Sequence, residues 1–408
     1  MLSRRSFLKA SLQAAIAGSA LLAKANAALK KMKITRVRFY ENPDSRPIFN
    51  QSMHVITVET DAGITGIGEG GMADSVKQCA ELIIGQDPSR IEHLWQHMYR
   101  AYFYPPGREK IHAQGGIDMA LWDIKGKALD VPVWELLGGR TRDYIECYST
   151  GFPNKGNLRD TARACMQAGF RAFRTGLAGA GQNGAVFDNR RMVDRTVEEC
   201  KQIREGVGPD GDWAIDYHTR VDFADAVRLS QALEPLKPLF CEDIVRSENK
   251  AVYKSIRQMV KVPLAVGEHF ADKWDLNELV EQHLLDFLRV TLPNTGGITE
   301  MMKIAALCET HYVGLTPHFT GPIAQTALVH VLCASSGAAL MEVRGDGSWN
   351  LPHLPKAFDF KDGKMWPNSR PGLGVELDTS KLKMVGEYTQ YSQPIPLYKR
   401  PDGSVTNW

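Results

Sequence analysis

Hydrophobic and polar positions change their period along this chain. Residues 32–70 alternate between apolar and polar side chains, as β-strands do, and the TDAG tetrapeptide at 60–63 predicts a hairpin turn between two such runs. Residues 74–142 follow the helical period instead, for example in GIDMALWDIKGKAL at 116–129. The first part of the chain is therefore predicted to form an α+β module.

From about residue 143, short apolar runs alternate with amphipathic helical stretches. This alternation predicts parallel strands joined by crossover helices, and eight strands within about 200 residues fit a (β/α)8 barrel. The eight runs are YIECYST (144–150), FRAFRTG (170–176), WAIDYH (213–218), LFCEDI (239–244), LAVGE (264–268), FLRVTL (287–292), VGLTPH (313–318) and ALMEVR (339–344).

The predicted fold is of the α/β class, a (β/α)8-type barrel with an α+β capping domain. A chain of 408 residues exceeds what one typical core supports. We expect the capping domain at 30–142, the barrel at 143–365, and a C-terminal segment at 366–408 that packs back on the capping domain.

The first 27 residues have the pattern of an export signal. SRRSFLKA contains the paired Arg4 and Arg5, an apolar stretch follows at 12–23, and ANA at 25–27 suits a cleavage site. This segment resembles a twin-arginine signal, which implies export of the folded protein to the periplasm. The alternative is a basic N-terminus on a short membrane anchor. After signal removal we expect no stable membrane insertion.

Charge and cysteine content narrow the function classes. The net charge is +2 and no basic run is present, so we expect no nucleic-acid partner. The seven cysteines are an odd, scattered set without CxxC spacing, which indicates buried apolar side chains and not a disulfide framework.

Three carboxylates follow three neighbouring strands at equal spacing. Asp216, Glu242 and Glu268 follow the apolar residues of the third, fourth and fifth runs, at intervals of 26 residues. The carboxyl ends of barrel strands meet at one mouth, where three buried like charges repel unless a cation lies among them. Oxygen ligands suit Mg²⁺, so we predict a magnesium site. The alternative is three unrelated acids that cap the following helices.

Two histidines are predicted at the same mouth. His218 follows Asp216 by two residues, and His318 ends the seventh run, on the opposite side of the barrel. That placement suits an acid and a base on two sides of one substrate. Glu342, in the eighth run, would either hydrogen-bond the substrate carboxylate or serve only as a residue of the barrel interior.

These motifs together resemble the enolase superfamily, mandelate racemase branch. The similarity is greatest to D-galactonate dehydratases and other acid-sugar dehydratases. The segments that carry it are IIGQDPSRIEHLWQHMYRAYFY (83–104), GIDMALWDIKGKALDVPVWELLGG (116–139), IDYHTRV, LEPLKPLFCEDIVRSEN, VGEHFADKWDL, GGITEMMKIAALCETH, TPHFTGPIA and PGLGVELD.

The resemblance implies a role for each matching position. Asp216, Glu242 and Glu268 match Mg²⁺ ligands. His318 matches the base that removes the proton from C2, and His218 matches the acid that protonates the departing 3-hydroxyl. Glu342 matches the acidic residue of the eighth strand near the substrate carboxylate, and Thr291 in the sixth run is a further candidate contact.

The loops at 42–51 and 103–110 are candidate lids over the mouth. Their Arg46, Asn50 and Arg108 would contact the substrate or else merely face solvent.

Two positions depart from the family pattern. FRAFRTG lacks the Lys-x-Lys pair of racemases, and Arg174 occupies a place similar to a catalytic Arg of mannonate dehydratases, or else forms a salt bridge within the barrel. Thr291 stands where an Asp usually orients the strand-seven His. Mannonate dehydratases have a similar residue there and use a Tyr–Arg pair, but the loop at 177–191 contains no Tyr.

The sequence thus predicts a hydro-lyase that dehydrates a sugar acid, such as galactonate, with Mg²⁺. The product would be a 2-keto-3-deoxy acid. A sugar-acid epimerase or cycloisomerase would share the enediolate step, and an exported sugar-acid-binding protein with weak catalysis is a further alternative. The expected partner is a small sugar acid, and we expect a homo-oligomer.

Overall fold

The computed structural model describes residues 32–41, 54–179, 188–319, 321–355, 357, 359–393 and 396–406. The predicted export signal and two candidate substrate contacts, Arg46 and Asn50, lie outside this range. Within it, no helix combines the length and the apolar character that crossing a membrane requires.

Eight parallel strands form the barrel. The first seven strands each pair with the next along the chain, β11 pairs with β4, and a bridge from Leu315 to Ala339 connects the last two. All eight apolar runs supply a strand, which confirms the predicted barrel. The strands are β4 (Ile145–Thr150), β5 (Ala172–Gly176), β6 (Asp212–Asp216), β7 (Phe240–Glu242), β8 (Leu264–Val266), β9 (Phe287–Leu288), β10 (Gly314–Leu315) and β11 (Met341–Arg344).

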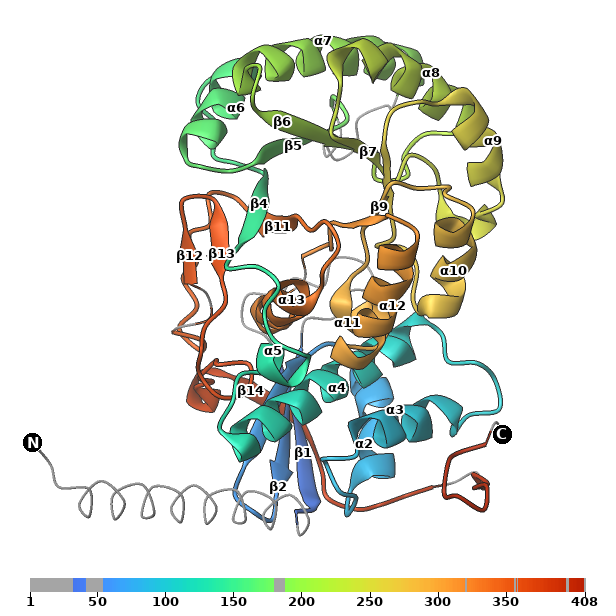
Figure 1. The fold of residues 1–408 in the computed structure, drawn as a ribbon, viewed down its shortest axis with the longest axis vertical. Helices are drawn as coiled ribbons and strands as arrows, with labels where there is room; N and C mark the ends of the chain where they lie inside the picture. The colour runs from blue at the N-terminus through green and yellow to red at the C-terminus, as the bar shows by residue number, and fades with distance from the viewer. Residues whose placement is uncertain are drawn as a thin grey trace, which may run out of the picture.

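Helices follow the first seven barrel strands and cover the outside of the barrel. The arc of α6 to α10 is visible in Figure 1. These helices are α6 (Leu158–Gln167), α7 (Asn189–Val207), α8 (Phe223–Leu233), α9 (Val252–Met259), α10 (Lys273–Glu281), α11 (Leu292–Thr295), α12 (Ile298–Thr310) and α13 (Pro322–Ala334), with the short 3-10 helices η1 (Glu234–Leu236) and η2 (Ser247–Asn249).

The eighth strand is followed by a hairpin. After β11 the described chain forms β12 (Asp359–Lys361) and β13 (Lys364–Trp366), and β13 pairs antiparallel with β4. Gly345, Gly347 and the prolines at 352 and 355 interrupt this stretch, which disfavours a helix. The barrel is therefore a modified one.

The capping domain combines an antiparallel sheet with helices. The strand order is β14-β1-β2-β3, so the C-terminal strand β14 lies beside the first strand of the described chain (Figure 1). The elements are β1 (Ile34–Glu41), β2 (Val55–Thr60), β3 (Thr65–Glu69), α2 (Ala73–Ile83), α3 (Ile91–Arg100), α4 (Arg108–Leu129), α5 (Val133–Leu136), η3 (Thr379–Lys381) and β14 (Lys383–Tyr388).

Close backbone packing and burial explain this arrangement. Gly66 lets β3 approach α4, because a Cβ atom there would lie 2.0 Å from the carbonyl oxygen of Ala120.

The seven cysteines are all buried and free, which confirms the prediction that they are apolar core residues.

Carboxylates of the capping domain bind the N-termini of two barrel helices. Glu69 accepts the backbone N–H groups of Ile323 (2.8 Å) and Ala324 (3.1 Å) on α13. Asp118 accepts the N–H of Thr299 on α12 at 3.0 Å. Helix N-termini favour negative charge, so these contacts fix the capping domain against the barrel.

Asp123 connects α4, β3 and the segment before β14. We predict that Asp123→Ala lowers the free energy of unfolding by about 3–5 kcal/mol. This buried carboxylate accepts the N–H groups of Ile67 (3.0 Å) and Leu373 (2.8 Å) and pairs with Lys127 (2.6 Å). The substitution leaves two buried donors unpaired. Urea unfolding measures the effect. Lys125→Ala, on the same helix, is the control, and an equal effect of the two variants would contradict the prediction.

Candidate active site

The predicted carboxylates meet at the carboxyl ends of the barrel strands. Asp216 and Glu242 are the last residues of β6 and β7, and Glu268 lies two residues beyond β8. All three are buried, at 1%, 0% and 9% exposure. Two further buried carboxyl groups join them: Glu342 from β11, and Asp243, which the sequence analysis did not select.

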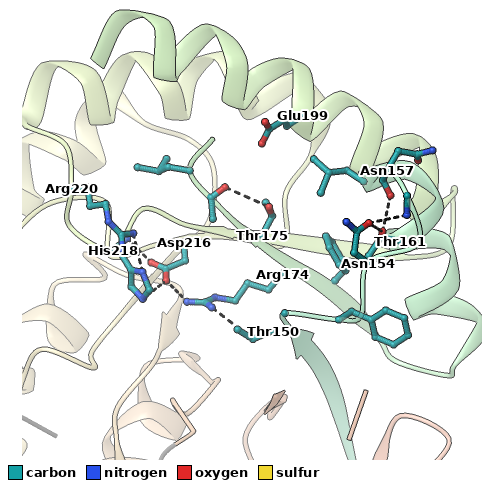
Figure 2. A pocket seen from close by; sticks show the side chains of 17 residues that line it. Thr150, Asn154, Asn157, Thr161, Arg174, Thr175, Glu199, Asp216, His218 and Arg220 are labelled. Atoms are coloured by element: carbon teal, nitrogen blue, oxygen red, sulfur yellow. Dashed lines mark hydrogen bonds and ion pairs between the residues drawn. The ribbon is translucent and has the colours of Figure 1, made fainter. Parts of the chain in front are cut away.

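Two guanidinium groups occupy the centre of this cluster. Arg289, directly after β9, is fully buried and donates to Glu342 (2.6 Å), to Glu242 and to the hydroxyl of Tyr148. Arg174 on β5 donates to Glu242 through Nε (2.8 Å) and to Asp216 through Nη2; Figure 2 shows it pointing toward Asp216 and Thr150. The salt-bridge role of Arg174 is thus present in the structure.

The cluster carries more negative than positive groups. Five buried carboxyl groups face two guanidinium groups. Burial raises the pKa of Asp243 well above its usual range, raises that of Glu268, and raises that of Glu242 to about 7. Burial opposes ionisation of Asp216 as well, but Arg174 and His218 hold its pKa at about 2. Asp216 therefore stays ionised, whereas burial disfavours the charged form of the other three carboxyl groups.

Two oxygen atoms of this cluster have no hydrogen-bond partner among the described residues: Oδ2 of Asp243 and Oε2 of Glu268. A buried carboxylate oxygen without a partner is costly. Asp243, Glu268 and His269 each offer one ligand atom within 4.8 Å of the others, and this is the one such group in the part of the chain that the structure describes. The residues present therefore fit a divalent cation. Asp216 and Glu242 are not members of this group.

The two predicted histidines both contact the carboxylates. Nε2 of His218 lies 2.8 Å from Oδ2 of Asp216, and its Nδ1 lies 2.9 Å from Nη1 of Arg220. Because a guanidinium only donates, Nδ1 accepts and the ring proton lies on Nε2. Nε2 of His318 lies 3.3 Å from Oε2 of Glu268, and its Nδ1 lies 3.2 Å from Oγ1 of Thr291.

The surroundings of the two imidazoles differ. The hydrogen bond to Asp216 raises the pKa of His218, whereas burial lowers the pKa of His318 to about 4. Environments that separate two pKa values in this way are typical of an acid–base pair.

The backbone at two of the strand ends has a left-handed conformation. The φ angles are 48° at His218, 55° at Thr219 and 40° at Asp243. Non-glycine residues rarely adopt such angles, and they concentrate at functional sites.

A cavity of about 610 Å³ opens beside His218 and Arg174. Its size is typical of a small-molecule site. Figure 2 shows polar side chains around it, contributed by the ends of β4, β5 and β6 and by the helices that follow. They include Thr150, Asn154, Thr175, Glu199 and Arg220.

The remaining predicted residues lie as follows. Glu342 is fully engaged by the protein, because it also accepts the hydroxyl of Thr150 and the N–H of Phe319. Thr291 is completely buried and contacts His318. Burial lowers the pKa of His269, and the negative charge of Glu268 partly opposes this shift. The positive charge of Arg108 lowers the pKa of His269 further.

Sequence reasoning missed Asp243, His269, Arg220 and Arg289. Asp243 and His269 each directly follow a predicted ligand, which was an available signal. Arg289 was visible as a charge inside the apolar run FLRVTL, since a charged residue in a buried strand needs a partner.

Known protein families match this chain over both domains. Residues 157–381 match the family described as enolase C-terminal domain-like, and residues 37–138 match the mandelate racemase / muconate lactonizing enzyme N-terminal domain.

Solved structures agree with this match. A member of the enolase superfamily from Salmonella Typhimurium is 26% identical, with a TM-score of 0.80, covering 88% of this chain and 100% of that one. A protein of Zymomonas mobilis ZM4, provisionally described as a dehydratase, is 25% identical, with a TM-score of 0.80 and the same coverage. A mandelate racemase/muconate lactonizing enzyme-like protein of Roseovarius sp. TM1035 is 27% identical, with a TM-score of 0.78, covering 85% and 94%. The chain therefore belongs to the mandelate racemase and muconate lactonizing enzyme branch of the enolase superfamily.

Proposed function

We propose that this protein is a hydro-lyase that dehydrates a sugar acid, such as galactonate or a related aldonate, with Mg²⁺ as cofactor. The observation that carries the proposal is the placement of two imidazoles at one carboxylate cluster. His218 follows β6 and His318 follows β10, the third and seventh of eight barrel strands. These strands lie on opposite sides of a closed barrel, so the two rings can act on two sides of one substrate.

The family resemblance assigns the cation to Asp216, Glu242 and Glu268, and the partnerless oxygens of Asp243 and Glu268 support a cation at this mouth. When bound, the cation would neutralise the charge that develops on the substrate carboxylate as the α-proton leaves.

His318 is the base of the proposed reaction. Its Nε2 faces the cluster, while Nδ1 lies 3.2 Å from Oγ1 of Thr291. If the Nδ1 proton is donated to this hydroxyl, Nε2 is free to take the proton from C2. Thr291 thus orients the ring without adding the negative charge that an Asp would supply.

His218 is the acid of the proposed reaction. The hydrogen bond to Asp216 raises the pKa of His218 and favours the imidazolium form, which can give up one proton and leave a neutral ring. Transfer of this proton to the 3-hydroxyl releases water, and the resulting enol tautomerises to a 2-keto-3-deoxy acid. The polar lining of the cavity beside His218 supports a substrate with several hydroxyl groups.

The N-terminal segment supports the periplasm as the compartment in which the enzyme acts. Its twin-arginine pattern and the ANA motif favour export of the folded enzyme to the periplasm.

The direct test is a panel of aldonic and uronic acids in D₂O with Mg²⁺, followed by NMR and a 2-keto-acid assay. The proposal predicts a 2-keto-3-deoxy product from at least one acid. Deuterium at C2 without a keto acid would indicate an epimerase. Binding of an acid without any exchange would indicate a binding protein.

The roles of the histidines predict different defects in two variants. His318→Asn loses both C2 deuterium exchange and dehydration, by about 10²–10⁴-fold, because the base is removed. His218→Asn loses dehydration but keeps C2 exchange, because only the acid is removed. His283→Asn, an exposed histidine outside the mouth, is the control. Loss of exchange in His218→Asn alone would reverse the two roles.

The Thr291 hydroxyl predicts a graded effect. Thr291→Val lowers kcat by about fivefold, because one neutral hydrogen bond to the base is worth about 1 kcal/mol. Thr291→Ser keeps the hydroxyl and retains most of the activity. Steady-state kinetics on the substrate found in the panel measures both variants, and equal kcat values for Val and Ser would contradict the orienting role.

A further inference from the structure

We propose that Arg108 of the capping domain binds a second anionic group of the substrate, so that the enzyme prefers sugar acids with negative charge at both ends. This inference rests on the proposed function, because it names the class of sugar acid that the same site takes. The class comprises aldaric acids, which carry a second carboxylate, and aldonic acids that carry a terminal phosphate.

Arg108 is the first residue of α4, and this helix begins beside the barrel mouth. About two turns further along α4, a Cβ atom at Gly115 would lie 2.3 Å from the carbonyl oxygen of Pro293 in α11, which follows β9. The hydroxyl of Tyr99 on α3 donates to Asp272, which follows β8, at 3.2 Å. The segment that joins α3 to α4 therefore adjoins the ends of β8 and β9; Figure 1 shows both helices next to α11 and α12.

The charge of Arg108 reaches the mouth itself. Burial lowers the pKa of His269, Glu268 opposes this shift, and the positive charge of Arg108 adds to it, so the guanidinium lies near this imidazole. His269 directly follows Glu268, and its Nε2 lies 3.8 Å from Oε1 of that residue. Arg108 thus approaches the substrate space from the capping domain, on the side formed by β8.

Arg108 has no anionic partner among the residues that the structure describes. Its side chain is half-buried, and its buried Nε atom lacks a hydrogen-bond partner within the described chain. Arg38 of the same domain, by contrast, pairs with Glu59 and Glu387. A partly desolvated guanidinium without an opposite charge is unfavourable, and an anion in the mouth would compensate it.

Helix stability does not explain an arginine at this position. The N-terminus of a helix carries partial positive charge, so a cation in the first turn is unfavourable. The N-termini of α12 and α13 follow the expected pattern, because they contact Asp118 and Glu69. At the start of α4 the charge has the opposite sign, which favours a role for Arg108 in binding a ligand.

The guanidinium selects the kind of group that it binds. Its planar fork of N–H donors matches a carboxylate or a phosphate with two parallel hydrogen bonds, whereas a hydroxyl group leaves the charge uncompensated. The reacting carboxylate of the substrate is the group that the proposed cation binds. The anion at Arg108 is therefore a second one, at the other end of the substrate.

The test compares three acids of the same stereochemistry: an aldaric acid, the aldonic acid, and the aldonic acid with a terminal phosphate. Calorimetric titration of the full-length protein with Mg²⁺ measures their dissociation constants in the His318→Asn background, in which turnover is blocked. Arg108→Gln and Arg108→Lys are introduced into this background. Arg90→Gln, at an exposed arginine of the same domain, is the matched control.

With Arg108 present, we expect the aldaric or the phosphorylated acid to bind about tenfold or more tightly than the aldonic acid, because hydrogen bonds between charged groups are strong. Arg108→Gln removes this preference and changes the affinity for the aldonic acid less than about twofold. Arg108→Lys retains part of the preference, and Arg90→Gln retains all of it. The acid that shows the preference identifies the anion as carboxylate or phosphate.

Four outcomes would overturn the inference. Equal binding of the three acids with Arg108 present excludes a second anion site, even if Arg108→Gln fails to fold. An unchanged preference in Arg108→Gln assigns the second anion to another residue, and an equal loss for all three acids assigns Arg108 to the reacting carboxylate. These three results leave the proposed dehydration intact, since the D₂O panel measures it separately. Absence of binding of any acid would refute the proposed function and the inference together.

Discussion

The barrel mouth depends on one electrostatic constraint: five buried carboxyl groups share two guanidinium groups. Removing an ion from water costs several kcal/mol unless a partner compensates it. Arg174 and Arg289 compensate Asp216, Glu242 and Glu342. The other two carboxyl groups of the cluster, Asp243 and Glu268, each have one oxygen without a hydrogen-bond partner among the described residues, and this supports the proposed cation.

Both domains contribute to the electrostatics of this carboxyl cluster. The closed parallel barrel brings all strand ends to one place, so groups more than a hundred residues apart share one cluster. The capping domain is held by carboxylates on the N-termini of α12 and α13, and it also brings the charge of Arg108 close to His269. The same domain that closes the structure thus contributes to the electrostatics of the mouth.

The sequence predicted the barrel well because buried parallel strands are continuous apolar runs. It also predicted the carboxylates and histidines, since their spacing follows the βα unit. The sequence analysis did not select Asp243, although this residue directly follows a predicted ligand, because alternation places neighbours on opposite faces of a strand. The strand ends at Glu242, and the left-handed φ of Asp243 removes it from that rule. Nor does spacing reveal where long side chains such as Arg174 and Arg289 end.

The most direct measurement is anomalous diffraction from crystals of the full-length protein soaked in Mn²⁺. The proposed function predicts one strong peak at the barrel mouth, among the carboxylates that follow β6, β7 and β8. The absence of a peak at the mouth would contradict it.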